Sequence, residues 1–197
     1  MKNFLRALEI QRWDDHRFYH HSLVNQTLHF ISAVSFLTAY AFMFSDPVNA
    51  ALIGWMVSMV TRQSGHFFFE PLGFDEENQV SNDYKEAVKV GYNLKRKVVL
   101  LSIWAFIPVA LYLNPTLLGL FDAHTNMDGY IDHVGKMWLA LGVGGLLFRT
   151  VHLFFLRDVQ TGLVWFTKIL TDPYHDIKLY HKAPLLLLRS IASRQHA

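Results

Sequence analysis

The sequence predicts an all-α protein, a polytopic membrane bundle of about four transmembrane helices with additional interfacial helices. Two observations lead to this fold class. Hydrophobic residues make up 52% of the 197 residues, and they are gathered into long runs, whereas a soluble core spreads them along the chain. Basic residues are concentrated in alternate connections between these runs, a bias that orients membrane helices. The length suits one domain, residues 1–197.

The first two apolar runs are expected to form a helical hairpin. Residues 22–44, SLVNQTLHFISAVSFLTAYAFMF, contain no charged residue and reach the roughly 20 residues that a spanning helix needs. A turn at Ser45–Pro47 follows, and proline suits the first position of a helix. The second helix is expected at residues 48–70, with Arg62 and His66 in its final third.

Two further runs complete the predicted bundle. The third helix is expected at residues 96–121, with a kink at Pro108 and a stop signal in the Asn114–Pro115 pair. The fourth is expected at residues 134–156, where closely spaced glycines allow close helix contact.

The remaining segments set the expected orientation. The N-terminal segment, the connection at 71–95 and the tail at 157–197 are rich in Lys and Arg, whereas the turns on the other side have none. Both termini are therefore expected in the cytoplasm. The N-terminal segment has no uninterrupted apolar core and no small-residue cleavage site, so no cleaved signal peptide is expected. The 71–95 connection is expected to form a surface helix or a lid.

The composition limits the residue types that can bind a metal and the class of partner. The chain has no cysteine, so any metal would be held by imidazole, carboxylate or water. The formal charge of +2 is small and evenly mixed, which argues against a nucleic-acid partner. The 11 histidines are numerous for this length. Most of them fall on the predicted cytoplasmic side, while His124 and His133 belong to the outer connection.

Three histidines lie at comparable depth within the predicted helices. His29 lies about two turns, or roughly 10 Å, into the first helix. His66 and His152 each lie about one turn from a cytoplasmic helix end. Ionisable residues in spanning helices usually face the bundle interior and have a function, and neutral imidazole binds iron, zinc and copper. Taken alone, each histidine is better explained as an interfacial residue that reaches headgroups or a backbone carbonyl.

Two neighbours of these histidines have a functional and an ordinary interpretation. Glu70 shares a helical face with His66, so it would bind the metal, orient the imidazole, or simply lie at a helix end. Asn25 shares a face with His29, so it would fix the imidazole tautomer or hydrogen-bond to another helix. The sequence leaves these alternatives open.

Two other groups of polar residues also allow two interpretations. His175 lies between Asp172 and Asp176 in the tail, a set that would close over a site or belong to a solvated interfacial helix. Arg62 and Arg149 lie near cytoplasmic helix ends. They would bind a substrate carboxylate, or reach lipid phosphates, which is the commoner use.

Two blocks of the sequence resemble a known family. The stretch YHHSLVNQTLHF, Tyr19–Phe30, matches the pattern Y-H-x4-N-x3-H, and RQSGHFFFE, Arg62–Glu70, matches Q-x-G-H-x-x-x-E. Both resemble the patterns of a family of small membrane proteins, formerly a domain of unknown function, described as iron(II)-dependent 2-hydroxy fatty acid dioxygenases. The resemblance is strongest over residues 19–70. Beyond them the chain departs from the family, with a long charged connection and a further hairpin.

The resemblance implies a non-haem Fe(II) centre at the cytoplasmic ends of the first two helices. The implied catalytic metal ligands are His20, His29 and His66, with three candidates for a further ligand, His152, His175 and Glu70. The residues implied around them are Tyr19, His21, Asn25 and Gln63. His21 is also the adjacent alternative to His20. The family reaction shortens a 2-hydroxy acyl chain by one carbon with O2, so the implied partners are a membrane lipid or fatty acid and O2.

Three other functions remain open on the sequence. A di-iron lipid hydroxylase would use repeated histidine boxes, of which only HRFYHH comes near. A membrane cytochrome would use a pair such as His29 and His66 as axial haem ligands. A metal-free accessory subunit of a membrane complex would need no such site. Whether the chain assembles as a homo-oligomer or within a membrane complex stays open on the sequence.

Overall fold

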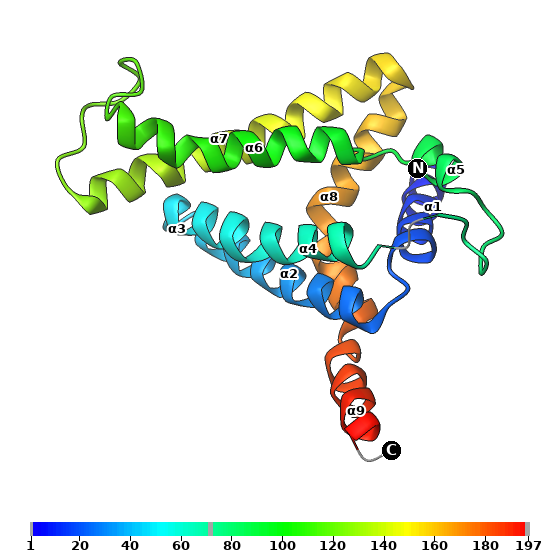
Figure 1. The fold of residues 1–197 in the computed structure, drawn as a ribbon. Coiled ribbons are helices and arrows are strands. Elements are labelled where there is room, and N and C mark those ends of the chain that lie inside the picture. Colours follow the sequence, from blue (N-terminus) through cyan, green and yellow to red (C-terminus); the bar gives the residue numbers. More distant parts are fainter. Residues whose placement is uncertain (1, 71–72, 196–197) are drawn as a thin grey trace.

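The computed structural model describes residues 2–70 and 73–195, and it is built from helices (Figure 1). Among the described residues the β-type pairing is an isolated antiparallel bridge between Asp75 and Val80. The predicted all-α class is confirmed for this part of the chain. The elements in order are α1 (Lys2–Tyr19), α2 (Leu23–Phe42), α3 (Pro47–Leu52), the π-helix η1 (Ile53–Met59), α4 (Val60–Phe68), α5 (Asn82–Val88), α6 (Leu94–Leu113), α7 (Met127–Leu156), α8 (Val159–Tyr180) and α9 (Ala183–Gln195).

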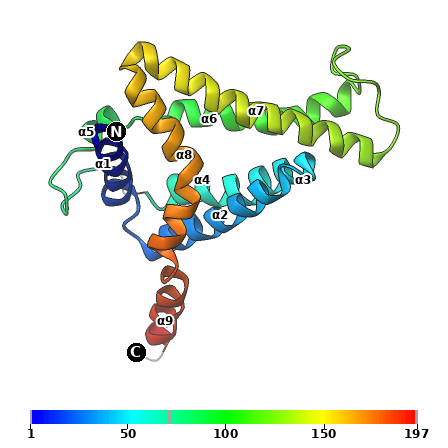
Figure 2. The same cartoon turned by 180° about the vertical axis from the view of Figure 1, so that it is seen from behind.

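Two helical arms lie next to each other and are joined at one end. One arm pairs α2 with the stretch formed by α3, η1 and α4, and the other pairs α6 with α7 (Figure 1). The view from behind shows α8 running from the end of α7 to α2, so that it packs against both arms (Figure 2). α1 packs against α8, and α9 contacts α2.

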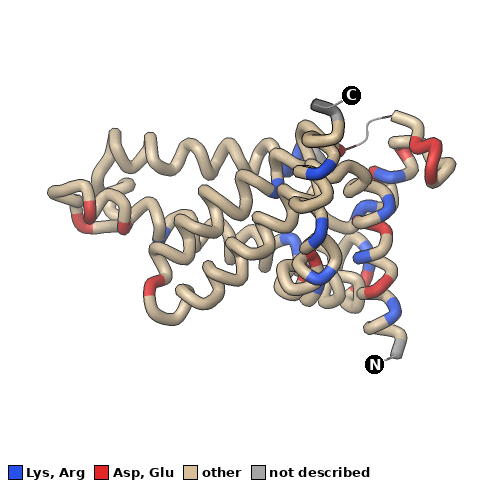
Figure 3. The backbone as a smooth tube through the Cα atoms, turned by 90° about the horizontal axis from the view of Figure 1, so that it is seen from below, with Lys and Arg blue, Asp and Glu red and all other residues tan. Residues whose placement is uncertain are grey.

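Charged residues gather at the joined end of the arms. Figure 3 shows Lys, Arg, Asp and Glu concentrated around α1, α5 and α8, while the arms are almost free of them. The few charges at the opposite end are mostly acidic. This distribution agrees with the orientation expected from the sequence, in which the basic end faces the cytoplasm. The orientation itself stays a prediction.

Two helices are long and apolar enough to cross a membrane, Lys95–Leu113 within α6 and Met127–Leu156, which is α7. Their large apolar side chains are mostly exposed, with Phe106 63% and Phe155 84% accessible. A soluble monomer rarely exposes so continuous an apolar surface, whereas lipid would cover it. A membrane location is thus supported by two helices, and the four-span bundle is not confirmed.

The other two predicted spans fall short because they carry polar residues or are interrupted. α2 has Asn25, Gln26 and His29 in its first half. The second predicted helix is divided by η1, and its last part, α4, carries Arg62 and His66. These polar residues belong to the site described below, so the same residues lower the hydropathy and build the site.

The π-helical turn η1 makes the two halves of one continuous helix face different neighbours. A π-turn rotates the residues that follow it about the helix axis and is frequent at functional sites. Trp55 in η1 faces α7, where its indole N–H donates to the carbonyl of Trp138 at 2.7 Å. Gly65 and His66 in α4 instead face α2.

Two predicted helix boundaries were wrong. α6 ends at Leu113 and not at residue 121, because the proline at 115 cannot continue the helical hydrogen bonding. α7 begins at Met127 and not at residue 134, because the Asn126 side chain caps its first turn. An apolar run marks the part of a helix that suits lipid, and the capped helix extends beyond it.

The segments predicted to flank the bundle contain helices as well. α5 occupies part of the 71–95 connection. The predicted tail forms α8 and α9, and its last two residues lie outside the described ranges. α8 is more than an interfacial helix, because it packs against α1, α2 and α7 and contributes buried polar residues to the site.

Candidate metal centre

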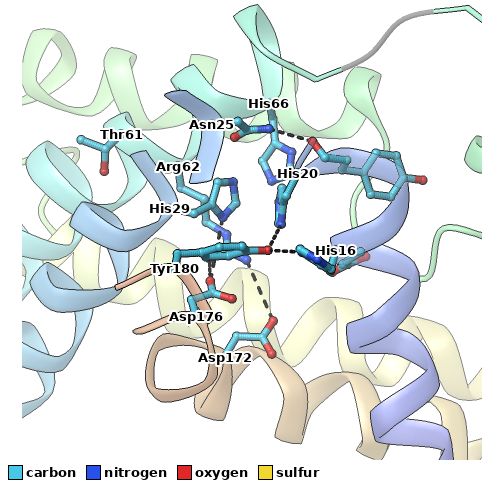
Figure 4. A network of polar contacts seen from close by, with 12 residues as sticks. His16, His20, Asn25, His29, Thr61, Arg62, His66, Asp172, Asp176 and Tyr180 are labelled. Atoms are coloured by element: carbon cyan, nitrogen blue, oxygen red, sulfur yellow. Dashed lines mark hydrogen bonds and ion pairs between the residues drawn. The ribbon is translucent and has the colours of Figure 1, made fainter. Parts of the chain in front are cut away.

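Three histidines converge where α1 leads into α2 and where α4 ends (Figure 4). His20, His29 and His66 each offer a ring nitrogen, and these nitrogens lie within 4.8 Å of one another. The ring centroids are 3.9 Å apart for His20 and His29, 4.9 Å for His29 and His66, and 5.6 Å for His20 and His66. The histidine triad, as we name these three residues, is therefore compact. His20 and His29 are buried, with 4% and 0% of their surfaces exposed, and His66 is half-buried.

His20 lies in a short break between α1 and α2. The side-chain amide of Asn25 donates to the carbonyl of Tyr19 at 2.7 Å, and that of Gln26 donates to the carbonyl of His20 at 2.9 Å. The Ser22 hydroxyl accepts from the backbone N–H of Asn25 and caps α2. These bonds fold the break over the first turn of α2, and this brings His20 to the triad.

Gly65 lets α4 approach α2 at the level of the triad. A Cβ at this position would lie 2.3 Å from Oδ1 of Asn25 and 3.2 Å from Cδ2 of His29. The first distance is far below van der Waals contact. The glycine immediately before His66 is therefore required for the two histidine-bearing helices to meet.

Several buried polar atoms of the triad and of the neighbouring Asn25 have no hydrogen-bond partner within the described part of the chain. Nε2 of His20, both ring nitrogens of His29 and Oδ1 of Asn25 are buried in this way. Leaving such an atom unpaired costs about 1–3 kcal/mol. Burial also lowers the pKa of His20 well below its ordinary value, so its ring is neutral, as a metal ligand must be. The residues thus fit the metal that the sequence patterns imply.

The nitrogens on the far side of two rings have partners on other residues. Nδ1 of His20 lies 2.7 Å from the hydroxyl of Tyr180, and Nδ1 of His66 lies 2.8 Å from Oε2 of Glu70. The other Glu70 oxygen accepts from the ammonium of Lys89 at 3.1 Å. A hydrogen-bond partner of this kind orients a metal-bound imidazole and fixes its tautomer. Glu70, a candidate ligand on the sequence, is placed here as the partner of His66.

Tyr180 links the triad to His16, a histidine outside the triad. Its hydroxyl lies 2.7 Å from Nδ1 of His20 and 3.0 Å from Nδ1 of His16. Burial, and then the neighbouring His21, lower the pKa of His16, so its ring is neutral and can accept a hydrogen bond. With Nε2 of His20 turned to a metal, Nδ1–H of His20 donates to Tyr180, and Tyr180 donates to His16.

Removing the Tyr180 hydroxyl should weaken metal binding without unfolding the protein. We expect Tyr180→Phe to lower the affinity for Fe(II) by about 10- to 100-fold, the effect typical of losing a ligand's hydrogen-bond partner. Competition with a chelator of known affinity measures this change. Tyr174→Phe is the matched control, because Tyr174 lies on the same helix with 58% of its surface exposed. Equal affinities in the parent and Tyr180→Phe would contradict the assigned role.

A buried ion-pair network fixes α8 against α1 and α4. Arg62 donates to Oδ2 of Asp176 at 2.9 Å. The ammonium of Lys168 pairs with Asp172 at 2.7 Å and with Asp15 of α1. Burial alone would lower the pKa of Lys168, but these two carboxylates outweigh it and raise that pKa. Arg62, predicted to bind substrate, is engaged by Asp176.

Three predicted site residues lie outside the triad. Arg149 on α7 contacts His152 at 3.3 Å and donates to the carbonyl of Val90 at 2.6 Å. His175 lies on α8 and does not belong to the triad. The geometry therefore does not place His152 or His175 as ligands, and it gives Arg149 the role of holding the 71–95 connection on α7.

The structure gives a different position to each of three other residues that were implied around the metal ligands. The Tyr19 hydroxyl donates to the carbonyl of Lys85 at 2.9 Å. His21 turns outward, toward the carboxylate of Glu77 at 3.3 Å, so it is His20 and not His21 that enters the triad. Gln63 lies beside the triad on α4, and its buried Oε1 has no partner among the described residues.

A cavity of about 240 Å³ opens beside the triad, between the two arms. His66 and Arg62 contribute to its wall, and the rest is mostly apolar and aromatic, including Trp55 and Leu100. Trp55 and His66 lie on the same continuous helix, roughly 16 Å apart at 1.5 Å per residue. The cavity therefore extends from the triad into the apolar part of the arms, a shape that suits a molecule with a polar head and an apolar chain.

The chain matches no known protein family, no curated protein and no solved structure. The family resemblance of the two sequence blocks stays a prediction. What the site can do must follow from its own residues.

Sequence reasoning left open whether Asp172 and Asp176 of α8 close over the site, and it missed Lys168 and Tyr180. Lys168, Asp172, Asp176 and Tyr180 recur at every fourth position, and such residues share one helical face. That spacing predicts a polar stripe on α8 that faces a partner helix. The sequence alone did not decide between this role and a solvated interfacial helix.

Proposed function

We propose that the chain is a membrane-embedded, non-haem Fe(II)-dependent oxygenase that acts on a 2-hydroxy fatty acid or a related lipid. In this proposal O2 oxidises the 2-hydroxy acid with cleavage of its C1–C2 bond, so that C1 leaves as CO2, one oxygen atom leaves as water, and C2 becomes the carboxylate of an acid one carbon shorter. Both termini lie in the cytoplasm. The observation that carries the proposal is the histidine triad, in which three imidazoles, two of them buried, each offer a ring nitrogen within 4.8 Å of the others. The sequence blocks that contain the triad resemble an oxygenase family of this chemistry.

The residues around the triad have defined tasks in this proposal. When bound, iron(II) supplies open coordination positions for O2 and for the oxygens of the substrate head. Tyr180 and Glu70 keep the protons of His20 and His66 on Nδ1, so that Nε2 of each ring is free to bind. The ion pairs of α8 hold α1 and α4 in place, and two of their members, Arg62 and Lys168, also line the cavity.

The geometry favours a non-haem centre over haem. The triad rings have centroids 3.9–5.6 Å apart, so neighbouring rings are close to contact. A porphyrin must lie between two axial imidazoles, and no pair within the triad leaves room for one. A metal-free accessory subunit would leave the unpaired imidazole nitrogens without a physical reason.

Turnover with matched lipids tests the proposal. The protein would be extracted from membranes with detergent and loaded with Fe(II) without oxygen. It would then be given O2 with 2-hydroxyhexadecanoate or with hexadecanoate. We expect O2 consumption and a product one carbon shorter from the 2-hydroxy acid alone. Recovery of the protein without detergent would contradict its membrane location. An iron-loaded protein that consumes no O2 with the 2-hydroxy acid would contradict the reaction.

A further inference from the structure

One cation in the cavity wall has no ion-pair or hydrogen-bond partner among the described residues. Four cationic residues line the cavity. Three have carboxylate partners at 2.9, 3.1 and 2.7 Å: Arg62 with Asp176, Lys89 with Glu70, and Lys168 with Asp172. The fourth, Lys97, has no hydrogen-bond or ion-pair partner within residues 2–70 and 73–195. It is the cavity's one free ammonium among the described residues.

Lys97 occupies a position that disfavours a positive charge. It lies in the first turns of α6, where the helix dipole favours anions and repels cations. Lys95 and Arg96 share this position in the sequence, but they are exposed to solvent, whereas Lys97 is partly buried. A partly buried, unpaired ammonium is costly in a folded protein, and a bound anion would offset that cost.

Lys97 also lies close to the triad. Its charge interacts electrostatically with Glu70 and Arg62, and with His66 of the triad. Arg62 and Arg149, the two cations chosen from the sequence, are engaged by Asp176 and by the carbonyl of Val90. Lys97 is the cation left to receive an anionic ligand at the wall that it shares with His66.

We infer that Lys97 is the specificity-determining residue that binds the anionic head of an amphiphilic ligand, whose apolar chain lies in the cavity between the arms. The inference rests on the proposed function, because the oxygenase needs the head of its substrate next to the triad. It assigns to Lys97 the selection of carboxylates over uncharged lipids. The apolar wall around Trp55 and Leu100 takes the chain and contributes little to that selection.

Binding of two chain-matched probes tests the inference. Dodecanoate and dodecan-1-ol share the chain and differ in charge, and their affinities would be measured by equilibrium dialysis in a neutral detergent. We expect the parent to prefer dodecanoate. Lys97→Met should lower that preference by about tenfold or more, because it removes a charge-assisted hydrogen bond. Lys97→Arg should retain most of it.

Lys95→Met is the matched control, because it removes a neighbouring but exposed charge of the same helix turn. An unchanged preference in Lys97→Met, an equal loss in Lys95→Met, or no preference in the parent would overturn the inference. The measurement is made with and without Fe(II). A parent that prefers dodecanoate but binds no iron would refute the oxygenase and leave the anion site standing. A parent that binds iron without any preference would refute the anion site alone.

Discussion

The His29→Ala variant is expected to retain less than one-tenth of the parent's Fe(II) after reconstitution, since losing a partner of a ligand already costs about 10- to 100-fold in affinity. His29 is fully buried, and neither of its ring nitrogens has a hydrogen-bond partner among the described residues, although Nδ1 lies 3.9 Å from Oδ2 of Asp176. His66→Ala should behave in the same way. Both variants should still be expressed, because the contacts between the helices are made mainly by side-chain packing away from these two histidines. Elemental analysis of the purified proteins measures the loss.

His152→Ala is the matched control for this loss. His152 is also a helical histidine predicted at similar depth, but it contacts Arg149 on α7 and lies outside the triad. We expect it to bind as much Fe(II) as the parent, and the same holds for His124→Ala. Full metal retention in His29→Ala and His66→Ala would end the oxygenase interpretation. Loss of metal in His152→Ala would show that the centre lies elsewhere.

Gly65→Ala should damage the site through a single added methyl group. The new Cβ would lie 2.3 Å from Oδ1 of Asn25, and Asn25 cannot easily yield because its amide is bonded to the carbonyl of Tyr19. Overpacking of this kind typically costs about 1–3 kcal/mol. α4 must therefore move away from α2 and carry His66 with it. We expect a lower melting temperature together with loss of Fe(II) binding.

Two further variants make the Gly65 result interpretable. Gly54→Ala adds the same methyl group to the same continuous helix, where no atom lies within 4 Å, so it should be neutral or slightly stabilising. Asn25→Ala removes the atom that the new methyl group meets. If the contact is the cause, Gly65→Ala should cost less in the Asn25→Ala background than in the parent. Equal costs in both backgrounds would contradict the mechanism.

The sequence indicated much of the fold because long apolar runs mark the helices directly. The hairpin that carries the triad begins and ends close to its predicted limits, since Ser22 and Asp46 provide cap signals next to apolar runs. α6 ends at the Asn114–Pro115 stop signal, although the apolar run suggested a helix up to residue 121, and the start of α7 was misplaced because hydropathy does not report the Asn126 cap. The division of the second helix by η1 could not be predicted, since a π-turn depends on packing around Trp55 and has no pattern of its own.

The candidate site could be predicted in part because the predicted hairpin determines which of its residues face each other. His29 and His66 lie on facing positions of one hairpin, and the matched sequence blocks add His20. Lys97 was missed because the reason to single it out is that it has no ion-pair partner among the described residues. An unpaired charge can be recognised only when the partners of its neighbours are known, and those partners, such as Asp176, come from distant parts of the chain.

Metal analysis of the parent protein tests the histidine triad most directly. The protein would be extracted gently from membranes, loaded with Fe(II) without oxygen, freed of excess metal and measured by elemental analysis with X-ray absorption. We expect one equivalent of iron per chain, coordinated by imidazole nitrogens, with no absorption band of haem. A chain that retains no iron after loading, or iron without imidazole ligands, would contradict the assignment of His20, His29 and His66 as a metal centre.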